Sequence, residues 1–358
     1  MPWMPPVRGS CWVPPIRVAR STSSPSRPIP STRALPLPDP APDADLLRIP
    51  VGPGSVHVER YGHGGTPIVL LHGFATSCFL WREVAPALAM AGFTAYAIDL
   101  FGYGESDRPF DAEFGIAAQA DYVDRAMTAL RLSSACVVGV DLGGGVALRL
   151  AAARPERVDG LVLVNSIGFD AVPGRDVRTL QRNTARFAFR VSRGMLGAAP
   201  LIGSVLQGGV ADPARMPDQL VARYLAPYVG REGVSHLLAL ARAVVVDDLE
   251  EVDLRLLAIP TLVLSGKLDR WVEPEISRAL AAAIPEARLV TMPGVGRLIP
   301  EEAPAELAAL IADFVASATG GSGPGTVDPA LPAARADAGA RAASPASAGT
   351  ERSEGELV

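Results

Sequence analysis

Residues 139–146, GVDLGGGV, place one acidic side chain between small residues. A buried-strand pattern precedes this stretch and a helical pattern follows it. Small residues are required where a strand turns sharply into a helix, because larger side chains would collide with the neighbouring backbone. Such a turn exposes Asp141 above the sheet, beside the N–H groups that begin a helix. Asp141 is therefore a candidate nucleophile, and an N-terminal helix cap is an equally good interpretation of this residue alone.

A second motif, HGF at residues 72–74, directly follows another predicted strand. Gly73 lets the backbone turn, so that the N–H of Phe74 faces the same point as the N–H of Leu142. Two such donors form an oxyanion hole, or a cradle for a halide or an alkoxide. We interpret His72 as a packed histidine that binds the loop, with contact to a substrate as the alternative.

Two further segments contain candidate site residues. Asp269, in LSGKLDRWVEP, follows a predicted buried strand by a short loop, where a carboxylate can orient a histidine. A solvated loop residue is the alternative for Asp269. The glycine-containing loop DLFGYGESDRP, residues 99–109, reads as structural support for the site.

The elements that must position these residues alternate between short β-branched runs and longer helical patterns. This alternation predicts a mostly parallel sheet with crossover helices, preceded by a hairpin built from LLRIPV and SVHVERYG. Between residues 171 and 255 the pattern is largely helical, without a clear strand. We therefore expect a helical insertion between two parts of the core, residues 45–170 and 256–318.

The order and spacing of these motifs resemble the α/β-hydrolase superfamily over nearly all of residues 45–318. The resemblance implies an α/β fold with a mostly parallel eight-stranded sheet, helices on both faces and a helical cap insertion. An aspartate in the turn resembles the haloalkane dehalogenase and epoxide hydrolase branches, whose Asp forms an ester that a histidine-activated water cleaves. By this resemblance Asp141 is the nucleophile, Asp269 the orienting acid, and Phe74 and Leu142 the backbone donors.

The resemblance extends to the cap and includes one departure. The segment RYLAPYVGREG is similar to the family's cap, and its Tyr224 and Tyr228 would point a hydroxyl at a departing or opening oxygen. Packing inside the cap is at least as good an interpretation of both tyrosines. The dehalogenases usually place tryptophan directly after the nucleophile, and Leu142 in that position weakens the expected halide site.

The main departure is that the family's catalytic histidine aligns with Arg297, in GVGRLIPEE. Arginine stays protonated and has no acceptor, so it is not a general base. His57 and His63 lie on the predicted hairpin, which leaves His236, in the cap, as the histidine that can approach the pocket. Between two carboxylates, Arg297 would stabilise their ionised forms by about 1.5–3 kcal/mol per charge-assisted hydrogen bond and reduce the nucleophilicity of Asp141.

These residues predict a hydrolase that acts on a small, largely apolar substrate through Asp141, with ester formation retained and ester hydrolysis impaired. One alternative is a lyase, isomerase or cyclase in which Arg297 holds a substrate carboxylate or phosphate and Asp141 shuttles a proton. A catalytically silent, ligand-binding pseudoenzyme with the same pocket is the other alternative.

The net charge and the cysteine spacing indicate which ligands and partners to expect. The net charge of −5 over 358 residues gives no field that favours nucleic acid or a membrane surface. Cys11, Cys78 and Cys136 are far apart and show no CxxC spacing, which argues against disulfides and zinc and favours the cytoplasm.

We expect no metal or cofactor, a small-molecule substrate, no nucleic acid, no stable membrane insertion, and a monomer or homodimer. Residues 1–44 and 319–358 have the composition of disordered segments.

Overall fold

The computed structural model describes residues 44–169, 172–181 and 202–318. All of them belong to one compact unit. The predicted extension of residues 1–44, apart from Ala44, and the predicted tail of residues 319–358 lie outside the described residues. Part of the predicted cap, residues 171–255, lies outside them as well.

Eight strands form one sheet, in the order β1-β2-β4-β3-β5-β6-β7-β8. The β1–β2 and β2–β4 pairs are antiparallel, and the other strand pairs are parallel. The mostly parallel eight-stranded sheet and its opening hairpin are thereby confirmed. In chain order the strands are β1 (Ala44–Pro50), β2 (Ser55–Tyr61), β3 (Pro67–Leu71), β4 (Thr94–Ile98), β5 (Ala135–Val140), β6 (Val158–Val164), β7 (Thr261–Gly266) and β8 (Arg288–Met292).

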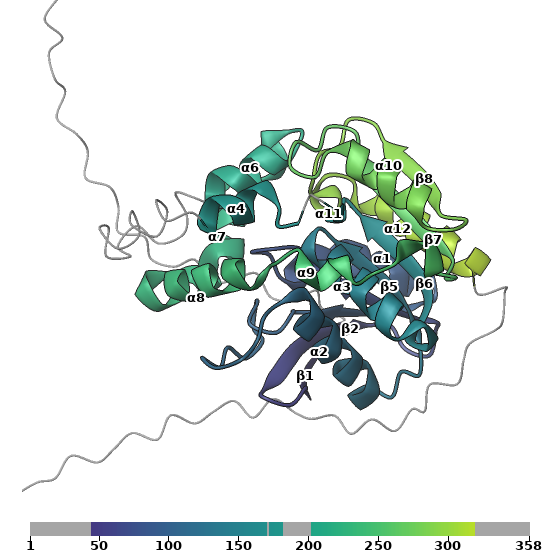
Figure 1. The fold of residues 1–358 in the computed structure, drawn as a ribbon, viewed down its shortest axis with the longest axis horizontal. Helices are drawn as coiled ribbons and strands as arrows, with labels where there is room; N and C mark the ends of the chain where they lie inside the picture. The colour runs from purple at the N-terminus through teal and green to yellow at the C-terminus, as the bar shows by residue number, and fades with distance from the viewer. Residues whose placement is uncertain (1–43, 170–171, 182–201, 319–358) are drawn as a thin grey trace, which may run out of the picture. The chain divides into compact units, whose positions relative to one another are not determined.

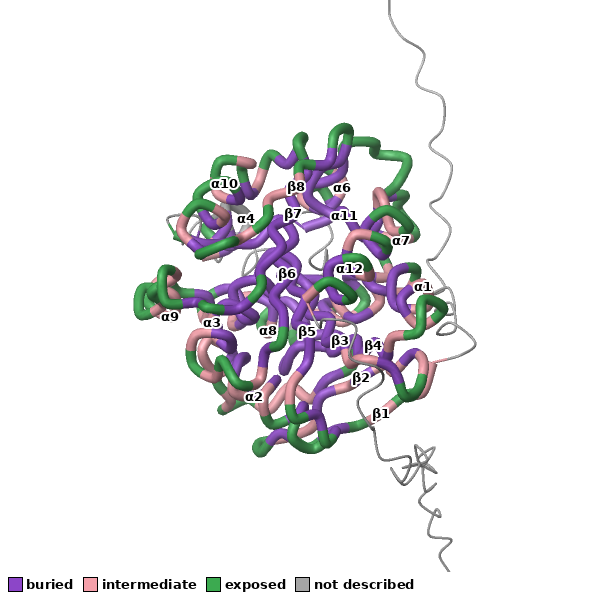
Figure 2. Tube along the Cα trace, turned by 90° about the vertical axis from the view of Figure 1, so that its right-hand side faces the viewer, coloured by how far each residue is buried: buried purple, intermediate pink, exposed green. Residues whose placement is uncertain are grey.

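Helices flank the sheet, as the crossovers between parallel strands require. They are α1 (Val84–Met90), α2 (Ile116–Ala129), α3 (Leu142–Ala153), α10 (Pro274–Ala283), α11 (Ile299–Glu302) and α12 (Pro304–Ala318), with the 3₁₀ segments η1 (Cys78–Trp81) and η2 (Pro155–Arg157). In Figure 2, α2 and α3 lie on one side of the strands, and α1 and α12 lie on the other. Helices on both faces agree with the expected fold class.

The described elements between β6 and β7 are all helical. They are α4 (Arg175–Gln181), α6 (Ser204–Gly209), α7 (Asp218–Leu225), α8 (Gly230–Ala243), α9 (Asp247–Glu250) and the 3₁₀ segments η5 (Pro213–Arg215), η6 (Ala226–Tyr228) and η7 (Leu254–Leu256). Figure 1 shows α4, α6, α7 and α8 to one side of the sheet. The division of the chain into a core and a cap stays a prediction.

The core lies around the central strands, which Figure 2 shows as buried. Every residue of β4, β5 and β7 is buried. Strands covered on both faces read as continuous apolar runs, which is why the sequence pattern located them. Among the described helices, none combines the length and the apolar character that crossing a membrane requires.

The turn from β5 into α3 positions the candidate nucleophile. Asp141 has φ 53° and ψ −114°, a conformation that costs a non-glycine residue about 1–3 kcal/mol. Its N–H donates to the carbonyl oxygen of Val164 (3.2 Å), and its carbonyl oxygen accepts from Gly144 (3.1 Å) and Ile167 (3.2 Å). These backbone bonds to α3 and to the end of β6 hold the strained residue in place.

Glycine is required beside this turn because the backbone after β3 approaches it closely. A Cβ atom on Gly143 would lie 2.5 Å from the carbonyl oxygens of both Leu71 and His72. Backbone atoms cannot move aside as a flexible side chain can. The small residues of GVDLGGGV therefore let the turn and the HGF segment lie against each other.

Substituting Gly143 by alanine tests this close approach. We expect Gly143→Ala to lower the free energy of unfolding by about 3 kcal/mol, measured by urea denaturation, because the turn must shift away from β3. Gly208 in α6 provides the control: it is exposed, and a Cβ atom there would lie 4.0 Å from its nearest neighbour, the ring of Trp271. Gly208→Ala should leave stability unchanged or slightly higher. Equal effects of the two substitutions would contradict the account of the turn.

Candidate active site

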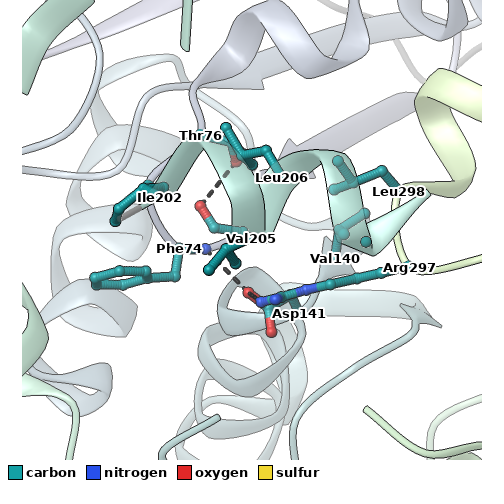
Figure 3. A pocket seen from close by; sticks show the side chains of 12 residues that line it. Phe74, Thr76, Val140, Asp141, Ile202, Val205, Leu206, Arg297 and Leu298 are labelled. Carbon is teal, nitrogen blue, oxygen red and sulfur yellow. Dashed lines mark hydrogen bonds and ion pairs between the residues drawn. The ribbon is translucent and has the colours of Figure 1, made fainter. Parts of the chain in front are cut away.

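Asp141 and Arg297 form a buried ion pair. The Nη2 atom of Arg297 lies 2.7 Å from Oδ2 of Asp141, and the two side chains are 7% and 4% exposed. The backbone N–H of Phe74 donates to the same oxygen at 3.1 Å. Figure 3 shows the guanidinium of Arg297 and the amide of Phe74 converging on this carboxylate. The sequence-predicted nucleophile, one predicted backbone donor and the unexpected arginine therefore meet at one point.

Asn165, at the end of β6, fixes the loop that carries Arg297. Its side-chain amide donates to the carbonyl oxygens of Gly296 and Arg297, both at 2.9 Å. Its Oδ1 accepts from the N–H of Gly266, the last residue of β7, at 2.8 Å. The N–H of Arg297 also donates to the carbonyl oxygen of Gly209 in α6, at 2.6 Å. Arg297 is thus held from its backbone as well as from its side chain.

Asp269 follows β7 and is the second acidic group beside Arg297. Its Oδ1 accepts from the N–H groups of Trp271 (2.7 Å) and Val272 (3.1 Å), whereas its Oδ2 is buried without a hydrogen-bond partner in the described structure. Burial raises the pKa of Asp269 to about 7, although the charge of Arg297 and the two N–H donors oppose this. The charge of Asp141 raises the pKa further. Near neutral pH, Arg297 therefore faces Asp141 and a partly protonated Asp269.

A small cavity of about 10 Å³ lies beside Asp141 and Arg297. About 10–15 Å³ is the space that one water molecule needs, so the cavity has no room for an organic substrate. The HGF segment and the end of β5 form part of its wall, and the rest includes Ile202, Val205, Leu206 and Gly209 of the α6 region and Leu298. Figure 3 shows Ile202, Val205 and Leu206 beside the ion pair. A molecule larger than water would fit beside Asp141 only if part of this lining moved.

None of the chain's histidines lines this cavity, and all four lie in the described structure. His72 Nε2 accepts from the N–H of Leu100 (3.0 Å) and its Nδ1 donates to the carbonyl oxygen of Gly73 (2.8 Å), while burial lowers its pKa. A neutral His72 thus ties two loops together, as the packed interpretation expected. His236 binds the carbonyl oxygen of Gly102 at 2.7 Å.

The other predicted contacts do not reach the cavity in this structure. Tyr224 is buried, and its hydroxyl donates to a carboxylate oxygen of Glu301. Tyr228 is buried too, and its hydroxyl has no hydrogen-bond partner in the described structure. Leu142, the predicted second donor, is the first residue of α3, directly after Asp141. Substrate contacts by Tyr224, Tyr228 and His72, and the donor role of Leu142, stay predictions.

Two site residues were missed by sequence reasoning. Asn165 stands at the carboxyl end of a parallel strand, where polar residues gather at one sheet edge, and this position was the available signal. The ring of Trp271 lies under Arg297, with its centroid 6.0 Å from the guanidinium carbon, a distance at which a cation–π attraction acts. Nothing in the sequence pattern indicated that contact.

Metal-binding side chains do not gather in this cavity. In the described part of the chain, the His, Cys, Asp and Glu side chains that lie close enough to share an ion are His57, Glu59 and Cys78, and none of them lines it. What the site offers is a buried carboxylate, a backbone donor and a fixed positive charge. A histidine to activate water is absent from the cavity lining.

The model of the family described as the alpha/beta hydrolase fold matches residues 66–304 of this sequence. The chain belongs to the α/β-hydrolase family. Among its relatives is a 2-hydroxymuconate semialdehyde hydrolase from Pseudomonas sp. (strain CF600), 30% identical over 270 residues, which cover 71% of this chain and 88% of the relative. A haloalkane dehalogenase from Mesorhizobium japonicum is 28% identical over 280 residues, covering 72% and 87%.

Solved α/β-hydrolase structures support the same assignment. The haloalkane dehalogenase DbeA from Bradyrhizobium elkani matches with a TM-score of 0.65 at 27% identity, covering 78% of this chain and all of that one. Cfl2 from Burkholderia cenocepacia matches with a TM-score of 0.65 at 26% identity, covering 75% and 95%. The resemblance to the superfamily and its dehalogenases is thereby confirmed.

The raised pKa of Asp269 predicts how stability depends on pH. Between about pH 4 and pH 7 the folded α/β-hydrolase holds a proton on Asp269 that the unfolded chain has lost, so this group makes the free energy of unfolding fall as pH rises. Asp269→Asn removes that contribution. The stability of the variant relative to wild type should therefore rise across this range, by on the order of 3 kcal/mol, and level off above pH 7. Parallel pH profiles from urea denaturation would contradict this.

Proposed function

We propose that this α/β-hydrolase reacts with small, largely apolar alkyl halides or epoxides through Asp141, and that the resulting ester is hydrolysed slowly or not at all. The observation that carries the proposal is the Asp141 carboxylate itself, held at a strained turn with Oδ2 bound by Phe74 and Arg297. The haloalkane dehalogenases among its relatives support the substrate class.

In the first step, a carboxylate oxygen of Asp141 attacks the electrophilic carbon of the substrate. With an alkyl halide, a carbon–oxygen bond forms, the carbon–halogen bond breaks, and the halide leaves with the bonding electrons. With an epoxide, the same bond forms, a ring carbon–oxygen bond breaks, and the released oxygen takes a proton from water. Arg297 keeps Asp141 ionised, but a carboxylate that accepts a charge-assisted hydrogen bond is a weaker nucleophile. We therefore expect ester formation to be slow, because the hydrogen bond from Arg297 that stabilises the ion pair also makes Asp141 a weaker nucleophile.

The second step requires a base to remove a proton from the water that attacks the ester. Arg297 occupies the position of that base and is not able to accept a proton. His236 binds the carbonyl oxygen of Gly102 and does not line the cavity, and His72 already uses both ring nitrogens. The proposed cycle therefore stops at the ester.

A catalytically silent protein of the same fold is the second candidate. The specific observation in its favour is the cavity of about 10 Å³, together with the backbone bond between Arg297 and Gly209 that holds α6 over it. Under this proposal α6 does not move away, and Asp141 serves as the partner that holds Arg297.

Intact-protein mass spectrometry after incubation with 1-bromohexane and with a terminal alkyl epoxide separates the two candidates. We expect a persistent mass increase of one hexyl group per chain with 1-bromohexane and of one hydroxyalkyl group with the epoxide, located by peptide mapping at Asp141 and absent in Asp141→Asn. Arg297→His should release the group and turn over repeatedly, because it restores a base at this position. An unmodified wild-type protein with every reagent would refute ester formation and favour the silent protein.

A further inference from the structure

A second cluster of reactive side chains lies outside the cavity beside Asp141. His57 and Glu59 stand two residues apart on β2 and so share one face of the strand. Cys78, the first residue of η1, covers that face. A ring nitrogen of His57, a carboxylate oxygen of Glu59 and the sulfur of Cys78 all lie within 4.8 Å of one another.

Two of these atoms lie close to the spacing that a metal site requires. Nε2 of His57 and Oε1 of Glu59 are 3.7 Å apart, beyond the usual hydrogen-bond range of about 2.7–3.2 Å. Zinc bonds of about 2.0–2.1 Å in tetrahedral geometry place two such ligand atoms about 3.3 Å apart. The sulfur of Cys78 would stand about 3.5 Å from each, which requires a movement on the order of 1 Å.

The charges around the cluster favour a cation. The carboxylates of Glu59, Asp99 and Glu105 act on His57, and those of Asp99 and Glu59 act on Cys78. Their negative potential favours a cation at this place. On binding it, Cys78 would give up its thiol proton, and a neutral His57 would bind through the lone pair of its ring nitrogen.

The carboxylate of Glu59 is oriented for this role by its neighbour. The hydroxyl of Tyr61 donates to Oε2 of Glu59 at 2.6 Å, which leaves Oε1 on the side of His57. Hydrogen bonds of this kind orient metal-binding carboxylates and strengthen the sites that contain them. The side chains of His57 and Glu59 are each 12% exposed, so an ion can reach them from solvent.

We propose that His57, Glu59 and Cys78 bind one Zn²⁺ ion through imidazole nitrogen, carboxylate oxygen and thiolate sulfur. Zinc accepts this combination of nitrogen, oxygen and sulfur ligands in tetrahedral geometry, with a water molecule in the fourth position. The ion links β2 to η1, the segment that follows the Phe74 loop. The sequence argued against zinc because its three cysteines are far apart and show no CxxC spacing. The fold brings one of them, Cys78, close to His57 and Glu59.

Zinc binding to the full chain, purified without a histidine tag and stripped of metal with EDTA, tests the proposal. After removal of EDTA and addition of Zn²⁺, we expect about one tightly bound ion per chain by elemental analysis and calorimetry. We also expect Zn²⁺, but not Mg²⁺, to raise the melting temperature. Co²⁺ in the same site should show a thiolate-to-cobalt charge-transfer absorption.

Cys136 provides the matched control, since it is also a free, buried cysteine but stands outside the cluster. Cys136→Ser should bind zinc like wild type, whereas Cys78→Ser and His57→Gln should bind it at least about tenfold more weakly. Glu59→Gln keeps the shape of the side chain, so it tests the site even if Cys78→Ser does not fold. A metal-free wild type that takes up no zinc, or equal binding by wild type and the folded ligand variants, overturns the proposal.

Discussion

Two opposite charges, on Arg297 and Asp141, lie 2.7 Å apart in an environment that leaves their side chains 7% and 4% exposed. Removing both from water costs several kcal/mol per ion, and the cost is offset only while each charge keeps its partner. Three features hold the two charges at this distance. They are the strained turn at Asp141, the bonds from Asn165 to the Arg297 loop, and the bond between Arg297 and Gly209. The geometry of the site therefore depends on this pair.

The ion pair between Arg297 and Asp141 also affects the pKa of Asp269. The single positive charge of Arg297 is paired with the carboxylate of Asp141. It therefore offsets only part of the effect of burial on Asp269, and the pKa of Asp269 rises to about 7. An imidazole at position 297 would accept a proton from water and transfer it. A guanidinium does neither, and its contact with Asp141 is a fixed electrostatic one. In the function proposed above, a hydrolase fold is therefore combined with a site that does not complete hydrolysis.

Local sequence patterns predicted most of the fold and part of the site. The turn at Asp141 and the HGF segment were predictable because their steric requirements are met by adjacent residues, and the strands because buried parallel strands are continuously apolar. The place of Arg297 beside Asp141 followed from family order alone. The position of Asn165 at the end of β6 was a signal that it could belong to the site. Its bonds to the Arg297 loop and the contacts of the α6 region were not predictable, because they join segments that are distant in sequence and leave no periodic signal.

A double-mutant cycle between Asp141 and Arg297 measures the central interaction directly. Urea denaturation of wild type, Asp141→Asn, Arg297→Gln and the double variant at pH 8 gives the coupling energy between the two side chains. The account predicts that each single variant is strongly destabilised, that the double variant loses much less than the sum, and that the coupling is about 2–3 kcal/mol. Additive effects, with a coupling below about 0.5 kcal/mol, would contradict it.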